Sequence, residues 1–129
     1  MIGGRSSRAF GNPNLSPVYG ASAVRLEILE WLPKVAERRR LDLGLPLGLL
    51  QLLPIKWIEA RECVRHVSDA RERMRSHDVD DWPSVALALA LAESRRVAIW
   101  TNDKDFEVAG VETITSAQLL ATLDRRTQL

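Results

Sequence analysis

Two clusters of acidic residues carry the clearest chemical signal in the sequence. The first follows an apolar run and places Asp103 and Asp105 directly after a hydroxyl and an amide side chain; the second holds three carboxylates between Asp78 and Asp81. Carboxylates this close repel one another, and the start of a helix relieves only part of the repulsion. A bound cation would relieve the rest, because Mg²⁺ and Mn²⁺ select carboxylate oxygen. Together the clusters favour a divalent-metal site.

Each cluster also has a purely structural explanation. Asp80 and Asp81 can cap a helix, and Asp103 with Asp105 can organise a turn through side-chain to backbone hydrogen bonds. Taken singly, the structural explanation is the simpler one for either cluster. The metal site is favoured because the expected topology brings both clusters to one edge of a sheet.

A covalent nucleophile is poorly supported. The chain has two histidines, His66 and His77, and one cysteine, Cys63, and none stands in a paired motif of nucleophile and base. His66 is expected at the surface, His77 in a turn, and Cys63 in the core. A single cysteine forms no internal disulfide, which favours a reducing compartment and a cytoplasmic location.

The apolar periodicity predicts strands and helices that alternate along the chain. Expected strands are 18–21, 55–58, 97–100 and 111–114. Expected helices are 22–40 with Ser22 as its cap, 43–53 capped by Asp42, 60–74, 80–92, and a closing helix from 115 or 116 to 123. Residues 1–16 are expected as loop or a short helix. This order predicts one α/β domain over residues 1–129, with three layers (α/β/α) and a mostly parallel sheet.

Composition excludes some classes of function and leaves others open. Eighteen basic and seventeen acidic residues give a net charge of +1, so no overall field favours nucleic acid or membrane. Fifteen of the basic residues are Arg, which suits an RNA partner but also occurs on solvated helix faces. The longest apolar run, 85–92, is far shorter than the roughly 20 residues that span a bilayer, so no membrane partner is expected.

These acidic segments resemble those of the PIN-domain nucleases, which include the toxins of bacterial toxin and antitoxin pairs. The similarity runs from about Gly3 to Leu123 and is most specific over 78–91 and 99–106. Members of this family use an acidic quartet around Mg²⁺ or Mn²⁺ to hydrolyse RNA. The resemblance therefore implies a metal-dependent endoribonuclease. As partners it implies RNA, an antitoxin protein and, as an assembly, a homodimer.

The resemblance also implies which acids form the site. Asp81 matches the acid that opens the penultimate long helix, and Asp103 matches the acid after the fourth strand. For the acid on the helix after the second strand the chain offers Glu27 and Glu30, of which Glu27 fits better because it lies nearer the strand ends. Asp105 is the nearest further candidate for the metal.

Substrate contacts are expected from polar and basic residues near these acids. Thr101 and Asn102 match polar residues that often precede the family's fourth-strand acid. The basic run Arg38, Arg39 and Arg40, or the cluster Arg71 to Arg75, is expected to contact RNA phosphates.

One departure from the family is as informative as the match. A PIN domain opens with an apolar strand that ends in Asp and lies at the centre of the sheet. No such segment precedes Gly3, and no Asp precedes Asp42. The fold is therefore expected to lack its central first strand, because the chain is either truncated or degenerate. Without that strand and its acid, the 129-residue chain is expected to have little or no activity.

Two other functions compete with the nuclease. The first is a non-catalytic remnant that binds RNA or protein through its Arg-lined helices and retains the acids as relics; metal binding separates it from the nuclease. The second is a receiver-like domain with an acidic Mg²⁺ pocket. It is disfavoured because the chain lacks paired acids after its first strand and a Lys after its last.

Overall fold

The computed structural model describes residues 8–127, and in it strands and helices alternate as expected. The expected α/β class is thereby confirmed. Part of the N-terminal segment interpreted as loop or short helix, residues 1–7, lies outside the described residues. The main elements, in chain order, are β1 (Val18–Ala21), α2 (Ser22–Arg38), α3 (Gly44–Leu52), β2 (Ile55–Ile58), α4 (Val64–Arg73), α5 (Trp82–Ala92), β3 (Ile99–Trp100), β4 (Thr113–Ile114) and α6 (Ser116–Thr127).

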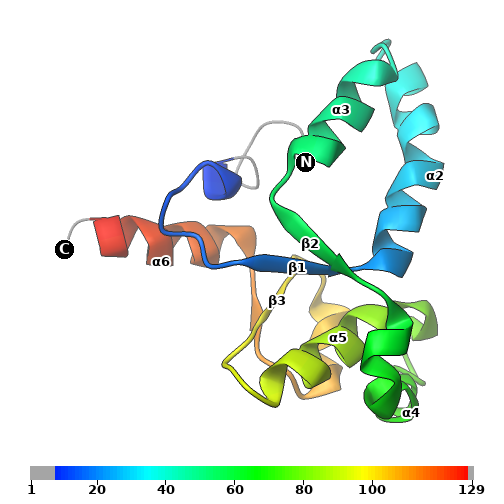
Figure 1. The fold of residues 1–129 in the computed structure, drawn as a ribbon, viewed down its shortest axis with the longest axis vertical. Coiled ribbons are helices and arrows are strands. Elements are labelled where there is room, and N and C mark those ends of the chain that lie inside the picture. Colours follow the sequence, from blue (N-terminus) through cyan, green and yellow to red (C-terminus); the bar gives the residue numbers. More distant parts are fainter. Residues whose placement is uncertain (1–7, 128–129) are drawn as a thin grey trace.

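Helices lie on both sides of the strands. Figure 1 shows α2 and α3 as a helical hairpin that rises on one side of β1 and β2, with α4 and α5 on the other side. Three short 3-10 helices connect these elements: η1 (Ala60–Cys63), η2 (Val79–Asp81) and η3 (Lys104–Ala109). This arrangement agrees with the three-layer prediction.

The described strands form two separate parallel pairs where a single sheet was expected. β1 pairs with β2 in the register Val18 to Ile55, and β3 pairs with β4 in the register Ile99 to Thr113. Helix α5 contacts both β1 and β3, so one helix supports both pairs. Within residues 8–127 no backbone ladder joins β1 to β3.

Helix α5 holds the centre of the core. Its residues Val85, Ala86, Leu87 and Ala88 are buried, and it makes its most extensive packing with α4. Met74, just after α4, is completely buried in the same cluster, a burial that stabilises the fold by about 2 kcal/mol. This packing fixes the position at which α5 begins, which is the residue after Asp81.

Several local predictions differ from the structure. Ser22 does not cap α2: the cap position is Ala21, without a side-chain hydrogen bond. Asp42 does accept a hydrogen bond from the amide of Gly44, at 3.0 Å. The helix expected over 60–74 is divided into η1 and α4. Glu59 and Glu62 form a reciprocal capping box at the start of η1.

The second strand pair is shorter than predicted. β3 and β4 have two residues each instead of four. Each strand of this pair has a hydrogen-bonded neighbour on one side only, so few of its backbone groups are paired. Most of the predicted strand 97–100 is therefore not held by strand pairing. Trp100 of β3 is fixed instead by its side chain, whose indole nitrogen donates to the Ser116 hydroxyl at 2.9 Å. None of the described helices is long and apolar enough to cross a bilayer.

Candidate active site

Asp81 occupies the cap position of α5 but does not act as a cap. Its side chain makes no capping hydrogen bond, although its own amide donates to the carbonyl of Asp78 at 3.1 Å. The cap of the preceding turn η2 is Asp78, whose carboxylate accepts from the amide of Asp80 at 3.2 Å. The structural explanation proposed for Asp81 therefore does not apply.

The negative charges of other carboxylates act on Asp81. Partial burial is the largest cause that raises its pKa to about 6, and the negative charges of Asp78, Asp103, Glu27 and Asp105 raise the pKa further. These neighbours come from the residue that caps η2, from α2, and from the start of η3 after β3. The pKa of Asp81 is therefore raised by all three acids that were expected to share its site: Glu27, Asp103 and Asp105. Glu30 does not contribute to this shift.

Asp103 lies in the loop after β3, as expected, and its hydrogen bonds also form a turn. Its Oδ1 accepts a hydrogen bond from the amide of Asp105 at 2.9 Å, and its own amide donates to the Thr101 hydroxyl at 3.0 Å. These bonds form the turn that begins η3, as the structural explanation anticipated. They also fix the direction of the Asp103 side chain after β3. In this structure the Thr101 hydroxyl positions Asp103.

Asn102 connects the acidic loop to the last helix. Its side-chain oxygen accepts a hydrogen bond from the amide of Ser116 at 3.2 Å, at the first residue of α6. Sequence reasoning assigned Asn102 to substrate and missed this bond. The available signal was a helix start at Ser116, but the sequence did not show that Asn102 lies beside it.

The two basic clusters lie at different distances from the acids. Helix α2 ends at Arg38, about 16 Å along its axis from Glu27, and Arg39 and Arg40 follow it. Arg71 is closer, because its guanidinium lies 4.7 Å from the ring centre of Trp82, the residue after Asp81.

The other arginines of the second cluster have partners on the protein itself. Arg73 pairs with Asp69, and Arg75 pairs with Glu72. These pairs make Arg71 the member of its cluster best placed for a substrate near Asp81.

His66 and Cys63 have structural roles. His66 was expected at the surface, but its ring is half-buried and lies 2.7 Å from a carboxylate oxygen of Glu93. Together with Arg65, which bonds the other Glu93 oxygen, it ties α4 to the end of α5. Cys63 is buried as expected, and burial raises the pKa of its thiol, which makes it a poor nucleophile.

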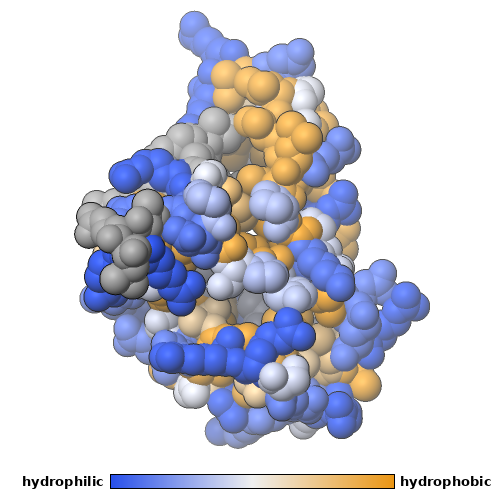
Figure 2. Space-filling model, turned by 60° about the vertical axis from the view of Figure 1, so that its left-hand side comes forward, coloured by the Kyte–Doolittle hydropathy of each residue, from blue (hydrophilic) through white to orange (hydrophobic). Residues whose placement is uncertain are grey.

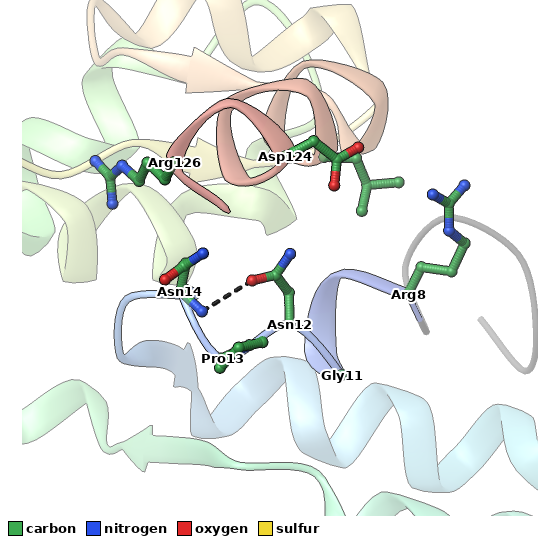
Figure 3. Close-up of a pocket in the computed structure, with 8 residues that line it drawn as sticks. Arg8, Gly11, Asn12, Pro13, Asn14, Asp124 and Arg126 are labelled. Carbon is green, nitrogen blue, oxygen red and sulfur yellow. Dashed lines mark hydrogen bonds between the residues drawn. The ribbon is translucent and has the colours of Figure 1, made fainter. Parts of the chain in front are cut away.

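A large open cleft lies away from the acids. It has a volume of about 660 Å³ and runs between residues 8–14 and α6. Figure 3 shows Arg8 and Arg126 at its two sides, with Asp124 between them and a hydrogen bond of 2.8 Å from the Asn14 amide to the Asn12 side chain. Its lining includes one acid and no histidine, so it lacks paired groups for hydrolysis.

The carboxylates around Asp81 fit a divalent cation in type and in charge. Their oxygens are the donors that Mg²⁺ and Mn²⁺ select, and their mutual repulsion is of the kind that a cation relieves. Among residues 8–127, however, no three His, Cys, Asp or Glu side chains are grouped closely enough to hold a metal ion. The described acids therefore supply the donor chemistry without a finished coordination site.

Comparison with known proteins identifies one family. A family model described as PIN domain matches residues 2–124, a span that includes all the acids discussed above. Searches of curated proteins and of solved structures gave no match.

Proposed function

The chain belongs to the PIN domain family, and we propose that it derives from a metal-dependent endoribonuclease that hydrolyses RNA phosphodiester bonds. PIN domains are generally nucleases. The observation that most supports the proposal is Asp81, a carboxylate with no capping bond whose pKa is raised to about 6 by burial and by acids from three parts of the chain. Such a perturbed group beside other acids is typical of a functional site.

Each acid has a distinct place in the proposed site. Glu27, Asp81 and Asp103 would hold Mg²⁺ or Mn²⁺, with Asp105 joining through water. When bound, the metal supplies an activated water and stabilises negative charge on the leaving oxygen. The protein contributes position: the packing of α5 fixes Asp81, and the turn bonded to Thr101 orients Asp103. No side chain needs to form a covalent intermediate.

RNA would reach these acids along basic and polar side chains. Arg71, stacked on Trp82 beside Asp81, would contact the nearest phosphate. Arg38, Arg39 and Arg40 would contact the strand farther along α2. Thr101 and Asn102 would act mainly by holding the acidic loop, because the hydrogen bonds described for them are internal.

We propose that a further parallel strand completes the sheet between β1 and β3. Among the described residues, β1 and β3 each have one edge whose backbone groups pair with no other strand. Helix α5 packs against both strands. An added strand would satisfy these backbone groups, and an Asp at its carboxyl end would join the acids at that edge. The buried free thiol of Cys63 supports a reducing, cytoplasmic location. An antitoxin partner and a single domain stay predictions.

Cleavage of single-stranded RNA with Mn²⁺ tests this function. The comparison is between the 129-residue chain and a form extended upstream by an apolar strand that ends in Asp. We expect cleavage by the extended form, lost with chelator or with Asp103→Asn and kept with Asp80→Asn, and little cleavage by the shorter chain. RNA binding without Mn²⁺-dependent cleavage in both forms would favour the non-catalytic remnant.

A further inference from the structure

The cleft between residues 8–14 and α6 takes no part in the proposed reaction. Its lining is mainly polar and includes Arg8, Asn12, Asn14, Asp124 and Arg126. Figure 2 turns toward the reader the side on which α6 lies in Figure 1, and hydrophilic surface predominates in its left-hand part. Apolar surface gathers in the upper part of the same view. The cleft therefore suits a charged ligand better than an apolar one.

The N-terminal wall of the cleft is held in place by packing and by hydrogen bonds. Ala9 is completely buried against α6, and the ring centre of Phe10 lies 5.0 Å from that of Trp100. The turn that follows has two backbone bonds, from the Asn12 amide to the Ala9 carbonyl at 3.1 Å and from the Leu15 amide to the Asn12 carbonyl at 3.2 Å. The cleft is thus formed before any ligand binds, which lowers the entropy cost of binding.

Three side chains of the lining offer hydrogen-bond donors. The side-chain oxygen of Asn12 accepts from the amide of Asn14 at 2.8 Å, so the Asn12 nitrogen is the atom that points toward α6 (Figure 3). Neither Arg8 nor Arg126 forms an ion pair or a side-chain hydrogen bond with another residue of 8–127. Two permanently charged guanidiniums and an amide are well suited to phosphate oxygens.

Asp124 restricts the kind of anion that the cleft accepts. Its carboxylate lies between the two arginines (Figure 3) and repels a phosphate placed beside it. A ligand therefore fits best when it has anionic groups at both sides of the cleft and a hydrogen-bond donor between them. A ribose-phosphate chain has this order, because a 2′-hydroxyl lies between successive phosphates and can donate to a carboxylate.

We infer that this cleft binds the backbone of single-stranded RNA, with Arg8 and Arg126 on two phosphates and Asp124 on a ribose 2′-hydroxyl between them. These contacts are to phosphate and sugar, so the cleft holds a strand without reading its base sequence. Because DNA lacks the hydroxyl, the cleft distinguishes RNA from DNA. An open, polar cleft suits a strand better than a small molecule, whose pockets are mostly apolar and enclose most of the ligand.

The cleft lies on the same helix that the acidic loop contacts. Helix α6 begins at Ser116, whose amide donates to Asn102, and Asp124 lies about 12 Å farther along the helix axis. A strand held in the cleft is therefore positioned by the element that also supports the acids. The choice of RNA rests on the proposed function, since an acidic peptide also carries anionic groups for two arginines.

RNA binding by the full 129-residue chain, measured by fluorescence anisotropy with chelator present, tests the cleft. Replacement of both Arg8 and Arg126 by Gln should reduce the slope of log affinity against log salt by between about 1 and 2, since two phosphate contacts are lost. Arg125→Gln is the matched control, because it removes the same charge outside the lining, and it should change the slope far less. Circular dichroism checks that each variant is folded. An unchanged slope in the double variant would overturn the proposal.

Asp124 provides a second readout that a merely cationic surface would not produce. With DNA of the same sequence as the comparison, Asp124→Ala should reduce the preference for RNA roughly tenfold, the value of one hydrogen bond to a charged group. Asp124→Asn keeps an acceptor oxygen and should retain most of the preference. Equal binding of RNA and DNA by the wild-type chain, or displacement of RNA by polyglutamate as readily as by unlabelled RNA, would contradict the assignment.

Failure of this inference and failure of the nuclease proposal give different results. The cleft variants are tested without Mn²⁺, so a loss of RNA binding in them supports the cleft even if the extended form cleaves no RNA. Cleavage by the extended form, together with unchanged RNA binding in all the cleft variants, overturns the cleft and leaves the nuclease in place.

Discussion

The surroundings of Asp81 disfavour the charged form of its carboxylate. The side chain is partly buried, makes no capping bond and faces the charges of other acids. A residue kept only as a helix cap would be in hydrogen-bonding contact with the free amides of α5. The arrangement thus lowers the stability of the metal-free protein, which is the pattern expected where function and stability compete.

Replacing Asp81 by Asn should stabilise the metal-free protein at neutral pH. The pKa of Asp81 in the fold, about 6, lies above its ordinary value of 3.8, so the folded state binds this proton more tightly than the unfolded chain. That contribution is fully present below about pH 4 and is lost as the pH rises to about 6. After discount for solvent screening, we expect Asp81→Asn to raise the free energy of unfolding by about 1 kcal/mol at neutral pH.

Thermal unfolding with chelator, near neutral pH and near pH 4, measures this difference. The expected gain is about 4 °C near neutral pH and close to zero in acid. Asp80→Asn, one residue away and exposed, is the control. A gain that does not depend on pH would show that charge repulsion is not its cause.

Asn102 should prove to be a residue that positions the acidic loop. Its side-chain oxygen accepts from the Ser116 amide, so Asn102→Ala should lower the free energy of unfolding by about 1 kcal/mol. Asn102→Asp keeps an acceptor oxygen and should recover most of that loss. Urea unfolding of the three proteins gives the comparison. If Asn102→Ala weakened RNA binding without loss of stability, the original assignment to substrate would be correct.

Among the elements, α5 was predictable and the second strand pair was not. The apolar run over 85–92 dictates a buried helix wherever the chain places it, and Pro83 suits the first turn of that helix. Strands β3 and β4 depend on neighbours that lie far away in sequence, so their two-residue lengths could not be read from local pattern. The start of α2 was also misplaced. Ser22 is of a residue type that often caps helices, but α2 begins at Ser22 itself, one residue earlier than predicted.

The end of α2 contains a backbone conformation that a glycine would adopt more easily. Arg40 has a φ of 53°, and the next residue, Leu41, donates back to the carbonyl of Ala36 at 2.8 Å, which closes the helix. Arg40→Gly should therefore raise the free energy of unfolding by about 0.5–1 kcal/mol. Urea unfolding measures the change, and Arg39→Gly is the control, since its φ is negative. A loss of stability in Arg40→Gly would contradict the strain argument.

For the whole molecule, the sequence indicated candidate acids and a common sheet edge for them, but not the contacts between separate elements. Asp81 and Asp103 stand out by composition and by the family resemblance. The raised pKa of Asp81 and the stacking of Arg71 on Trp82 depend on contacts between separate elements. The separation of Arg38 to Arg40 from Glu27, in contrast, follows from the length of the predicted helix. Contacts across elements arise from packing, which local patterns do not encode.

Because the net charge is only +1, RNA affinity should depend on local contacts. Binding of single-stranded RNA should weaken steeply with salt, since phosphate contacts release counterions. Arg71→Gln should reduce the slope of log affinity against log salt by about 1. Arg61→Gln, an exposed change on η1, should leave it unchanged. Fluorescence anisotropy over a salt series measures both slopes, and an Arg71→Gln slope equal to that of wild type would contradict the proposed path.

Calorimetry of Mn²⁺ binding to the purified chain near neutral pH tests whether Glu27, Asp81 and Asp103 form a cation site. We expect weak but specific binding, which Asp81→Asn and Asp103→Asn each abolish and Asp80→Asn preserves. Binding should also fade as the pH falls below about 6, because Asp81 then takes up its proton. No binding by the wild-type chain, or equal binding by all four proteins, would contradict the claim.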